Sequence, residues 1–135
     1  MGEVRLHWDG DRLQFHGTTA YGDPISVGGD AEGPGAKPSD LLPLSLAACT
    51  AYDVVEIIRK QRQVLRGLDV VVTSTQDPDP PWTFRSIHCE FVLTGDIDES
   101  KAERAVSLAE GKSCAVAATI APVVALTHAV RIVGV

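Results

Sequence analysis

Hydrophobic and polar positions alternate with a period of two near the start of the chain. Residues 4–8 alternate between apolar and polar side chains, as expected for a strand with one buried face. The Asp-Gly-Asp turn signal at 9–11 is followed by a second alternating segment at 13–15. A third short strand is predicted over 24–27. Together these patterns predict an N-terminal antiparallel meander.

The middle of the chain changes to a helical pattern. Residues 28–40, GGDAEGPGAKPSD, are rich in Gly and Pro and predict a loop of a length that often carries function. Pro38-Ser39-Asp40 then provides a helix start. The helix is expected from about residue 39 to Gln63, and it is apolar nearly all round its circumference, which is typical of a central, buried helix. Pro43 is expected to bend its entry.

The second half of the chain alternates strand and helix patterns. The predicted elements are a strand at 68–75, a loop at 76–81, a strand at 85–93, a helix at 99–110, a short helix at 114–120 and a strand at 128–135. We expect Gly111 to close the first of these helices and Ser113 to cap the second. The order of elements favours an α+β fold, and the length favours one domain over residues 1–135.

Composition and charge narrow the class of protein. The net charge is −6, and no basic cluster offsets it, which argues against a nucleic-acid surface and an anionic membrane surface. The apolar run 41–58 contains Asp53 and Glu56, which makes a membrane-spanning helix unfavourable. The first residues lack the apolar stretch of a signal peptide. We therefore expect a cytoplasmic protein that binds neither nucleic acid nor membrane.

Three cysteines are the main candidates for chemistry. An odd number without an export signal argues against a structural disulfide framework. The chain has no CxxC motif, and its four histidines are scattered, so no metal site is expected. What remains is redox chemistry at a thiol, or thiols that are buried and inert.

The local setting of each cysteine separates these two readings. Cys89 lies in the middle of a strand among apolar neighbours, which favours a structural role. Cys114 falls in the first turn of a predicted helix, with Lys112 upstream, so the helix dipole makes it the easier thiolate, and reactive and inert readings weigh equally. Cys49 lies in the middle of the apolar helix, where its surroundings alone favour an inert thiol.

Two segments of the chain carry a recognisable pattern: GPGAKPSDLLPLSLAACTAYDVVEIIRKQR and, further along, KSCAVAATI. The first resembles the central segment of the OsmC/Ohr family of OsmC-like proteins and organic hydroperoxide resistance proteins. The second resembles the second signature of that family, and the two segments have the family's order and separation. The resemblance implies an α+β domain with antiparallel sheets around a long central helix. It also implies an intertwined homodimer with the active site at the dimer interface.

The resemblance also implies a reaction. In the hydroperoxide-reducing branches two cysteines act together, and by position these are Cys49 and Cys114. Cys49 would be the thiolate that attacks an organic hydroperoxide, and Cys114 would resolve the resulting sulfenic acid as a disulfide. The family implies no bound cofactor and no metal, with regeneration by an external dithiol reductant, of the lipoyl type in the Ohr branch.

An ionised attacking sulfur needs an Arg beside it and a carboxylate that holds this Arg. Ser39 stands where the Ohr branch has Glu, and Asp40 supplies an acid one residue later, an offset that resembles the YhfA-like branch. The candidate cations near the N-terminus are Arg5 and Arg12, and we take Arg12, which lies next to the first predicted hairpin. Because this network departs from the Ohr pattern, a second hypothesis stays open: a non-enzymatic dimer that binds a small apolar or sulfur-containing ligand in the interface pocket.

Overall fold

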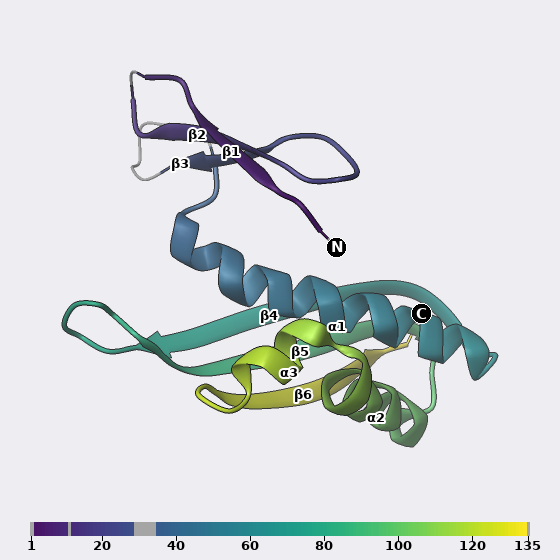
Figure 1. Cartoon of the computed structure of the whole chain (residues 1–135). Helices are drawn as coiled ribbons and strands as arrows, with labels where there is room; N and C mark the ends of the chain where they lie inside the picture. Colours follow the sequence, from purple (N-terminus) through teal and green to yellow (C-terminus); the bar gives the residue numbers. More distant parts are fainter. Residues whose placement is uncertain (1, 11, 29–34, 135) are drawn as a thin grey trace. The chain divides into compact units, whose positions relative to one another are not determined.

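The computed structural model of the protein describes residues 2–10, 12–28 and 35–134 (Figure 1). The chain divides into two compact units, Met1–Leu42 and Pro43–Val135. Residues 29–34, part of the Gly/Pro-rich loop predicted at 28–40, lie outside the described residues.

The N-terminal unit contains a three-stranded antiparallel sheet. Its strands are β1 (Arg5–Trp8), β2 (Gln14–Thr18) and β3 (Ile25–Gly28), paired in the order β1-β2-β3. After β3 the chain returns at Ala36, whose N–H donates to the carbonyl of Ser26 at 2.9 Å. The meander predicted from the alternating pattern is confirmed.

One face of this sheet is apolar. Cross-strand pairing places Trp8 opposite Phe15, and Phe15 opposite Val27, so these side chains share a face. The Trp8 and Phe15 ring centroids are 6.4 Å apart. Leu6 lies on the same face and is 64% exposed, and Trp8 is 50% exposed. A large part of an apolar sheet face is therefore open to solvent in the single chain.

The long helix begins with a 3₁₀ turn, Pro38–Asp40, and continues as α1 (Leu41–Lys60). It ends earlier than expected, because Arg62 adopts a left-handed conformation with φ of 61°. Pro43 lies in the first turn of α1, where a missing N–H interrupts no α-helical hydrogen bond, and the bend expected there stays a prediction.

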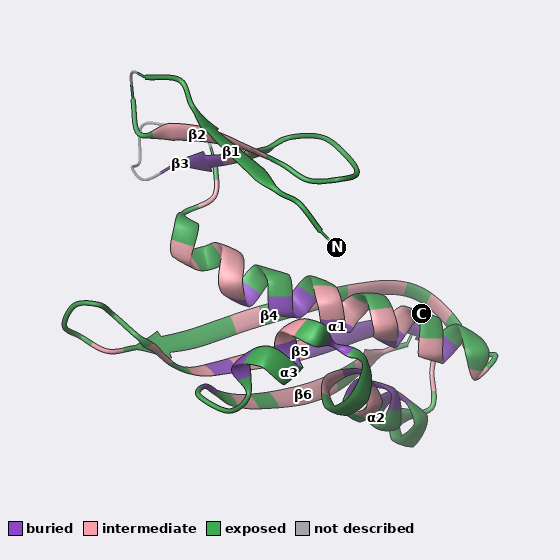
Figure 2. Cartoon of the chain, viewed as in Figure 1, coloured by how far each residue is buried: buried purple, intermediate pink, exposed green. Residues whose placement is uncertain are grey.

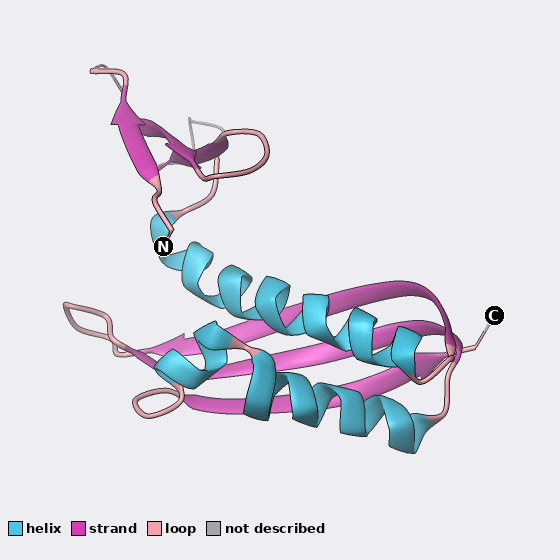
Figure 3. Cartoon of the chain, turned by 45° about the vertical axis from the view of Figure 1, so that its right-hand side comes forward, coloured by secondary structure: helices cyan, strands magenta, loops and turns pink. Residues whose placement is uncertain are grey.

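The C-terminal unit is a three-stranded sheet with helices over one face (Figure 3). Strands β4 (Val64–Gln76) and β5 (Phe84–Asp96) form a long antiparallel hairpin, and β6 (Ala125–Val133) pairs parallel to β5. Parallel pairing requires a crossover. The crossover contains α2 (Glu99–Leu108), a π-helical turn η2 (Ala109–Ser113) and α3 (Ala115–Ile120).

The core of this unit lies between β5 and the helices (Figure 2). Alternate residues of β5 are at most 2% exposed: Ile87, Cys89, Phe91 and Leu93. They pack under one stripe of α1, whose buried members are Pro43, Leu46, Ala47, Thr50, Val54 and Ile58. The opposite stripe of α1 carries exposed apolar residues, among them Leu44 and Tyr52, and its burial against a partner stays a prediction.

The segment before Cys114 also differs from the prediction. Gly111 does not close a helix but lies inside the π-helical turn η2, which continues α2. The residue that caps α3 is Cys114 itself, not Ser113. The strand β6 begins at Ala125, three residues before the predicted strand.

Gly95 is required where β5 ends against β4. Its φ is 147°, and a Cβ there would lie 2.3 Å from the carbonyl oxygen of Val64. We expect Gly95→Ala to lower the free energy of unfolding by about 2 kcal/mol or more, measured by urea denaturation. Gly111→Ala is the matched control, because a Cβ there meets no atom within 4 Å. Equal stability of the two variants would contradict this account of Gly95.

Candidate functional site

Cys49 lies in the middle of α1, at the border between its buried and exposed stripes. It is half-buried, whereas Leu46 and Thr50 beside it are each 1% exposed. The Thr50 hydroxyl donates to the carbonyl of Leu46 at 2.8 Å, so this polar group is satisfied within the helix. Cys49 is therefore the one cysteine of the three that is not fully buried.

Cys114 connects the π-helical turn to α3. Its backbone N–H donates to the carbonyl of Ala109 at 2.9 Å, which closes the turn. Its sulfur accepts a hydrogen bond from the N–H of Ala117 at 3.3 Å, as the N-cap of α3. The side chain is 2% exposed. Backbone groups of the crossover therefore hold both the N–H and the sulfur of Cys114.

The structure brings Cys49 and Cys114 together, although they lie 65 positions apart in the chain. Their side chains are hydrogen-bonded, and both cysteines are free thiols. Both belong to the C-terminal unit. The two thiols that the sequence singled out form one site between α1 and the start of α3.

Burial raises the pKa of Cys114 to about 11, and the hydrogen bond with Cys49 adds to this, while the N–H of Ala117 acts in the opposite direction. Cys114 is therefore protonated at neutral pH. The expectation that Cys114 would be the easier thiolate was wrong, because desolvation outweighs the favourable helix start.

Cys89 lies below this pair on β5. It is 2% exposed, and burial raises its pKa to about 11, with further contributions from nearby Glu110 and Cys114. A thiol held protonated in the core is a poor nucleophile. The structural role expected for Cys89 agrees with this environment.

Sequence reasoning missed a third group, His128 on β6. Its Nε2 lies 2.5 Å from Oε1 of Glu103, and its Nδ1 lies 2.5 Å from Oε1 of Glu110. His128 is the register partner of Cys89 on the neighbouring strand. Glu103 and Glu110 are seven residues apart, a spacing that puts them on one helix face, and this spacing was the only signal in the sequence.

The expected activating pair, Arg12 and Asp40, belongs to the N-terminal unit. Asp40 ends the 3₁₀ turn before α1, and the carbonyl of Arg12 accepts a hydrogen bond from Nε1 of Trp8 at 2.6 Å. Across the described residues, no ion pair joins Arg12 to Asp40. The structure does not bring these two side chains together.

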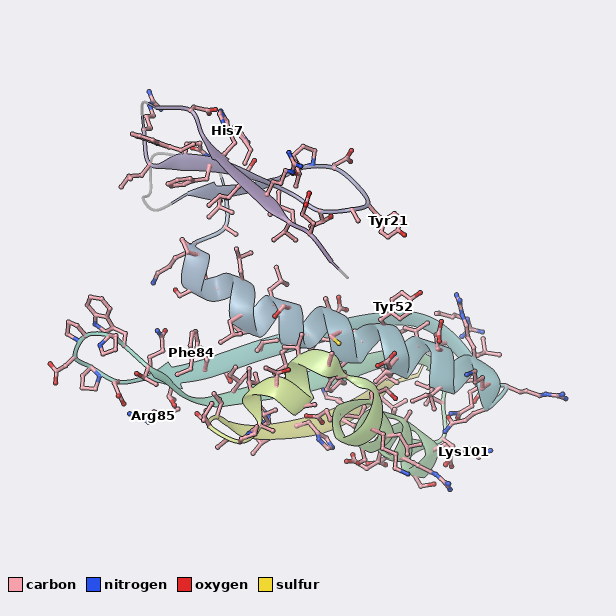
Figure 4. All side chains as sticks on the ribbon, viewed as in Figure 1. His7, Tyr21, Tyr52, Phe84, Arg85 and Lys101 are labelled. Carbon is pink, nitrogen blue, oxygen red and sulfur yellow. The ribbon has the colours of Figure 1, made fainter. Side chains whose placement is uncertain are left out.

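An open groove of about 460 Å³ lies along the uncovered stripe of α1. Tyr52, which is 69% exposed, points away from the sheet (Figure 4). The groove is lined by Ala48, Ala51, Tyr52, Val55, Glu56, Arg59 and Leu68. It is mainly apolar, with a carboxylate and a guanidinium toward the C-terminal end of the helix.

Two further properties concern metals and membranes. In the part of the chain that the structure describes, no three His, Cys, Asp or Glu side chains gather as a metal site would require. The helical segment Pro38–Lys60 is long and apolar enough to cross a membrane, with 28% of its most apolar window buried. The core helix of a soluble protein meets the same criterion.

Comparisons with known proteins agree with the sequence resemblance. A family model described as OsmC-like protein matches residues 29–129. The chain is 31% identical to protein YhfA of Escherichia coli K12, over 98% of both chains. It superposes on a hypothetical protein of Aquifex aeolicus with a TM-score of 0.89, 26% identity and coverage of 100% and 98% of the two chains. An organic hydroperoxide resistance protein OsmC of Legionella pneumophila shares the fold, with a TM-score of 0.70, 18% identity and coverage of 97% and 96%.

The burial of the thiols predicts their order of reactivity. At pH 8 we expect iodoacetamide to alkylate Cys49 at least about tenfold faster than Cys89 or Cys114, because both of these are buried and their pKa is raised. Mass spectrometry of the three peptides measures each rate. Protein unfolded in urea is the control, in which all three should react alike. Equal rates for Cys49 and Cys114 in the folded protein would contradict the site geometry.

Proposed function

Because the chain belongs to the OsmC-like family, whose members include organic hydroperoxide resistance proteins, we propose that it is a thiol-dependent peroxidase for organic hydroperoxides. The observation that carries this proposal is the hydrogen bond between Cys49 and Cys114. Cys49 is the attacking thiol, and Cys114 is the resolving thiol. Family membership by itself supports the coarser statement of a redox or peroxide-related function.

The proposed reaction has two steps. The Cys49 thiolate attacks the outer oxygen of the hydroperoxide, the O–O bond breaks, Cys49 becomes a sulfenic acid, and the alkoxide takes up a proton and leaves as an alcohol. The Cys114 sulfur then attacks the Cys49 sulfur. A disulfide forms, and the sulfenic oxygen leaves with the Cys114 proton as water. An external dithiol, such as a lipoyl group, then reduces the disulfide.

The burial of the two cysteines suits these roles. Cys49 is half-buried, so a small hydroperoxide can reach it, while Cys114 is 2% exposed and protected from direct oxidation. The N–H of Ala117 points at the Cys114 sulfur and stabilises the negative charge that develops there as its proton leaves. The activation of Cys49 by Arg12 and Asp40 stays a prediction, since both residues belong to the N-terminal unit and no ion pair joins them among the described residues.

The uncovered apolar surfaces support a homodimer as the working form. The exposed stripe of α1 includes Leu44 (58% exposed) and Tyr52, and the N-terminal sheet exposes Leu6 and Trp8 on its apolar face. Patches of this kind mark surfaces that a partner covers. A second copy of the chain covers them when the same surface of each copy meets its counterpart across a two-fold axis. This also accounts for an apolar helix in a cytoplasmic protein without a membrane.

The groove along α1 favours one alternative function. Its apolar wall begins at Ala48, next to Cys49, and could hold a small apolar or sulfur-containing ligand without any reaction. In that case the protein would be a binding dimer, and ligand affinity would be the same in Cys49→Ser as in the wild type.

The reaction with stoichiometric cumene hydroperoxide tests the peroxidase. We expect the wild type to lose two of its three thiols and to form a Cys49–Cys114 disulfide, identified by peptide mass spectrometry. Cys49→Ser should lose activity entirely, since it lacks the attacking sulfur. Cys114→Ser should accumulate a sulfenic acid that dimedone traps.

Cys89→Ala is the matched control for these variants. It removes the third thiol and should keep both thiol loss and disulfide formation, because Cys89 takes no part in the proposed reaction. A wild type that keeps all its thiols in excess hydroperoxide would overturn the peroxidase and leave the binding dimer.

The association state tests the dimer. We expect the wild type to sediment as a dimer, and Tyr52→Glu to raise the dimer dissociation constant at least about 30-fold, because it places a charge on a central apolar surface. Val123→Glu is the matched control, since Val123 is 76% exposed but lies outside α1. A monomeric wild type at micromolar concentration would contradict the dimer.

A further inference from the structure

His128 joins two parts of the crossover to the sheet. One ring nitrogen pairs with Glu103 on α2, and the other pairs with Glu110 on the π-helical turn. The side chains of His128 and Glu110 are only 22% and 15% exposed, while that of Glu103 is 51% exposed. The pair with Glu110 is therefore the more shielded of the two, and shielding strengthens an ionic interaction.

Glu110 depends on this contact. Burial raises the pKa of Glu110, and the interaction with His128 opposes that rise. The buried Oε1 of Glu110 accepts no regular hydrogen bond from any other described residue, and its close polar neighbour is Nδ1 of His128. Loss of His128 would leave a largely buried carboxylate with only the smaller favourable contribution of His88, which is costly. The π-helical turn would then have to move so that Glu110 reaches water.

A movement of this turn would directly change the position of Cys114 in the thiol site. The turn Ala109–Ser113 runs into Cys114, whose N–H donates to the carbonyl of Ala109 at 2.9 Å. π-Helical turns that continue an α-helix are rare and frequently occur at functional sites. In this chain the buried side-chain support is the contact between Glu110 and His128.

We propose that His128 is a positioning residue for the thiol pair: through Glu110 it holds the π-helical turn, and so keeps the Cys114 sulfur beside Cys49. This inference rests on the proposed redox pairing of the two cysteines. His128 touches neither sulfur in this role. What it sets is the effective concentration of Cys114 at Cys49, which determines how readily the two thiols form a disulfide.

Equilibration with glutathione measures this effective concentration without any hydroperoxide. One oxidised glutathione takes two electrons from the protein dithiol, so a Cys49–Cys114 disulfide and two reduced glutathione molecules form. We expect His128→Gln to lower this equilibrium constant about tenfold, which corresponds to a reduction potential about 30 mV less negative. The rate of Cys49 oxidation by cumene hydroperoxide should stay within about twofold of the wild type.

Glu110→Gln and the double variant show whether His128 acts through Glu110. Each single variant should lower the constant, and the double variant should match the single variants instead of adding to them. Glu90→Gln is the matched control on the same sheet. Glu90 follows Cys89 on β5 and therefore points to the opposite face, where its only described ion pair is with Arg131 at 3.9 Å.

The outcomes separate this inference from the proposed reaction. An unchanged constant in folded His128→Gln, an equal loss in Glu90→Gln, or a wild type without the disulfide would overturn the positioning role. If His128→Gln does not fold, as judged by near-ultraviolet circular dichroism, Glu110→Gln alone decides in the same way. A wild type that does not react with hydroperoxide but forms the disulfide with glutathione would overturn the peroxidase and leave the positioning role intact.

Discussion

The parallel pairing of β5 with β6 is the constraint on which the thiol site depends. Parallel neighbours cannot be joined by a tight turn, so the chain must cross over the sheet between them, and here it does so through α2, the π-helical turn and α3. The crossover lies on the same face as α1 (Figure 3). The start of α3 therefore comes to lie beside the middle of α1, and two cysteines from distant segments meet.

Burial, more than the helix dipole, sets the chemistry of this site. A thiol at a helix start gains from aligned N–H groups, and Ala117 does lower the pKa of Cys114. The loss of water around a side chain that is 2% exposed is the larger effect and raises the pKa to about 11. The same desolvation acts on Cys89 and on Glu110. A carboxylate in this core stays ionised more readily when a cationic side chain lies beside it. The contact of Glu110 with His128 is important for this reason.

The apolar surfaces of the single chain have a common physical basis. A helix and a sheet each bury one side within their own unit and leave the other side apolar, as seen on α1 and on the β1–β3 sheet. Hydrophobic positions all round a helix predict that each of its sides is covered. They do not report what covers them, since a second copy of the chain and its own core demand the same side chains.

The pattern of residues determined the order and type of nearly all elements, because alternation and helical spacing are local properties of the chain. It also singled out Cys49 and Cys114 through the context of each segment. Tertiary structure alone decided that the two thiols interact, that burial raises the pKa of Cys114, and that His128 pairs with Glu103 and Glu110. It also decided that Cys114, not Ser113, caps α3, after a π-helical turn that no local pattern signals. These features depend on which distant segments the parallel pairing of β5 and β6 brings together and on how completely those segments exclude water from the side chains. Neither property can be read from a short stretch of sequence.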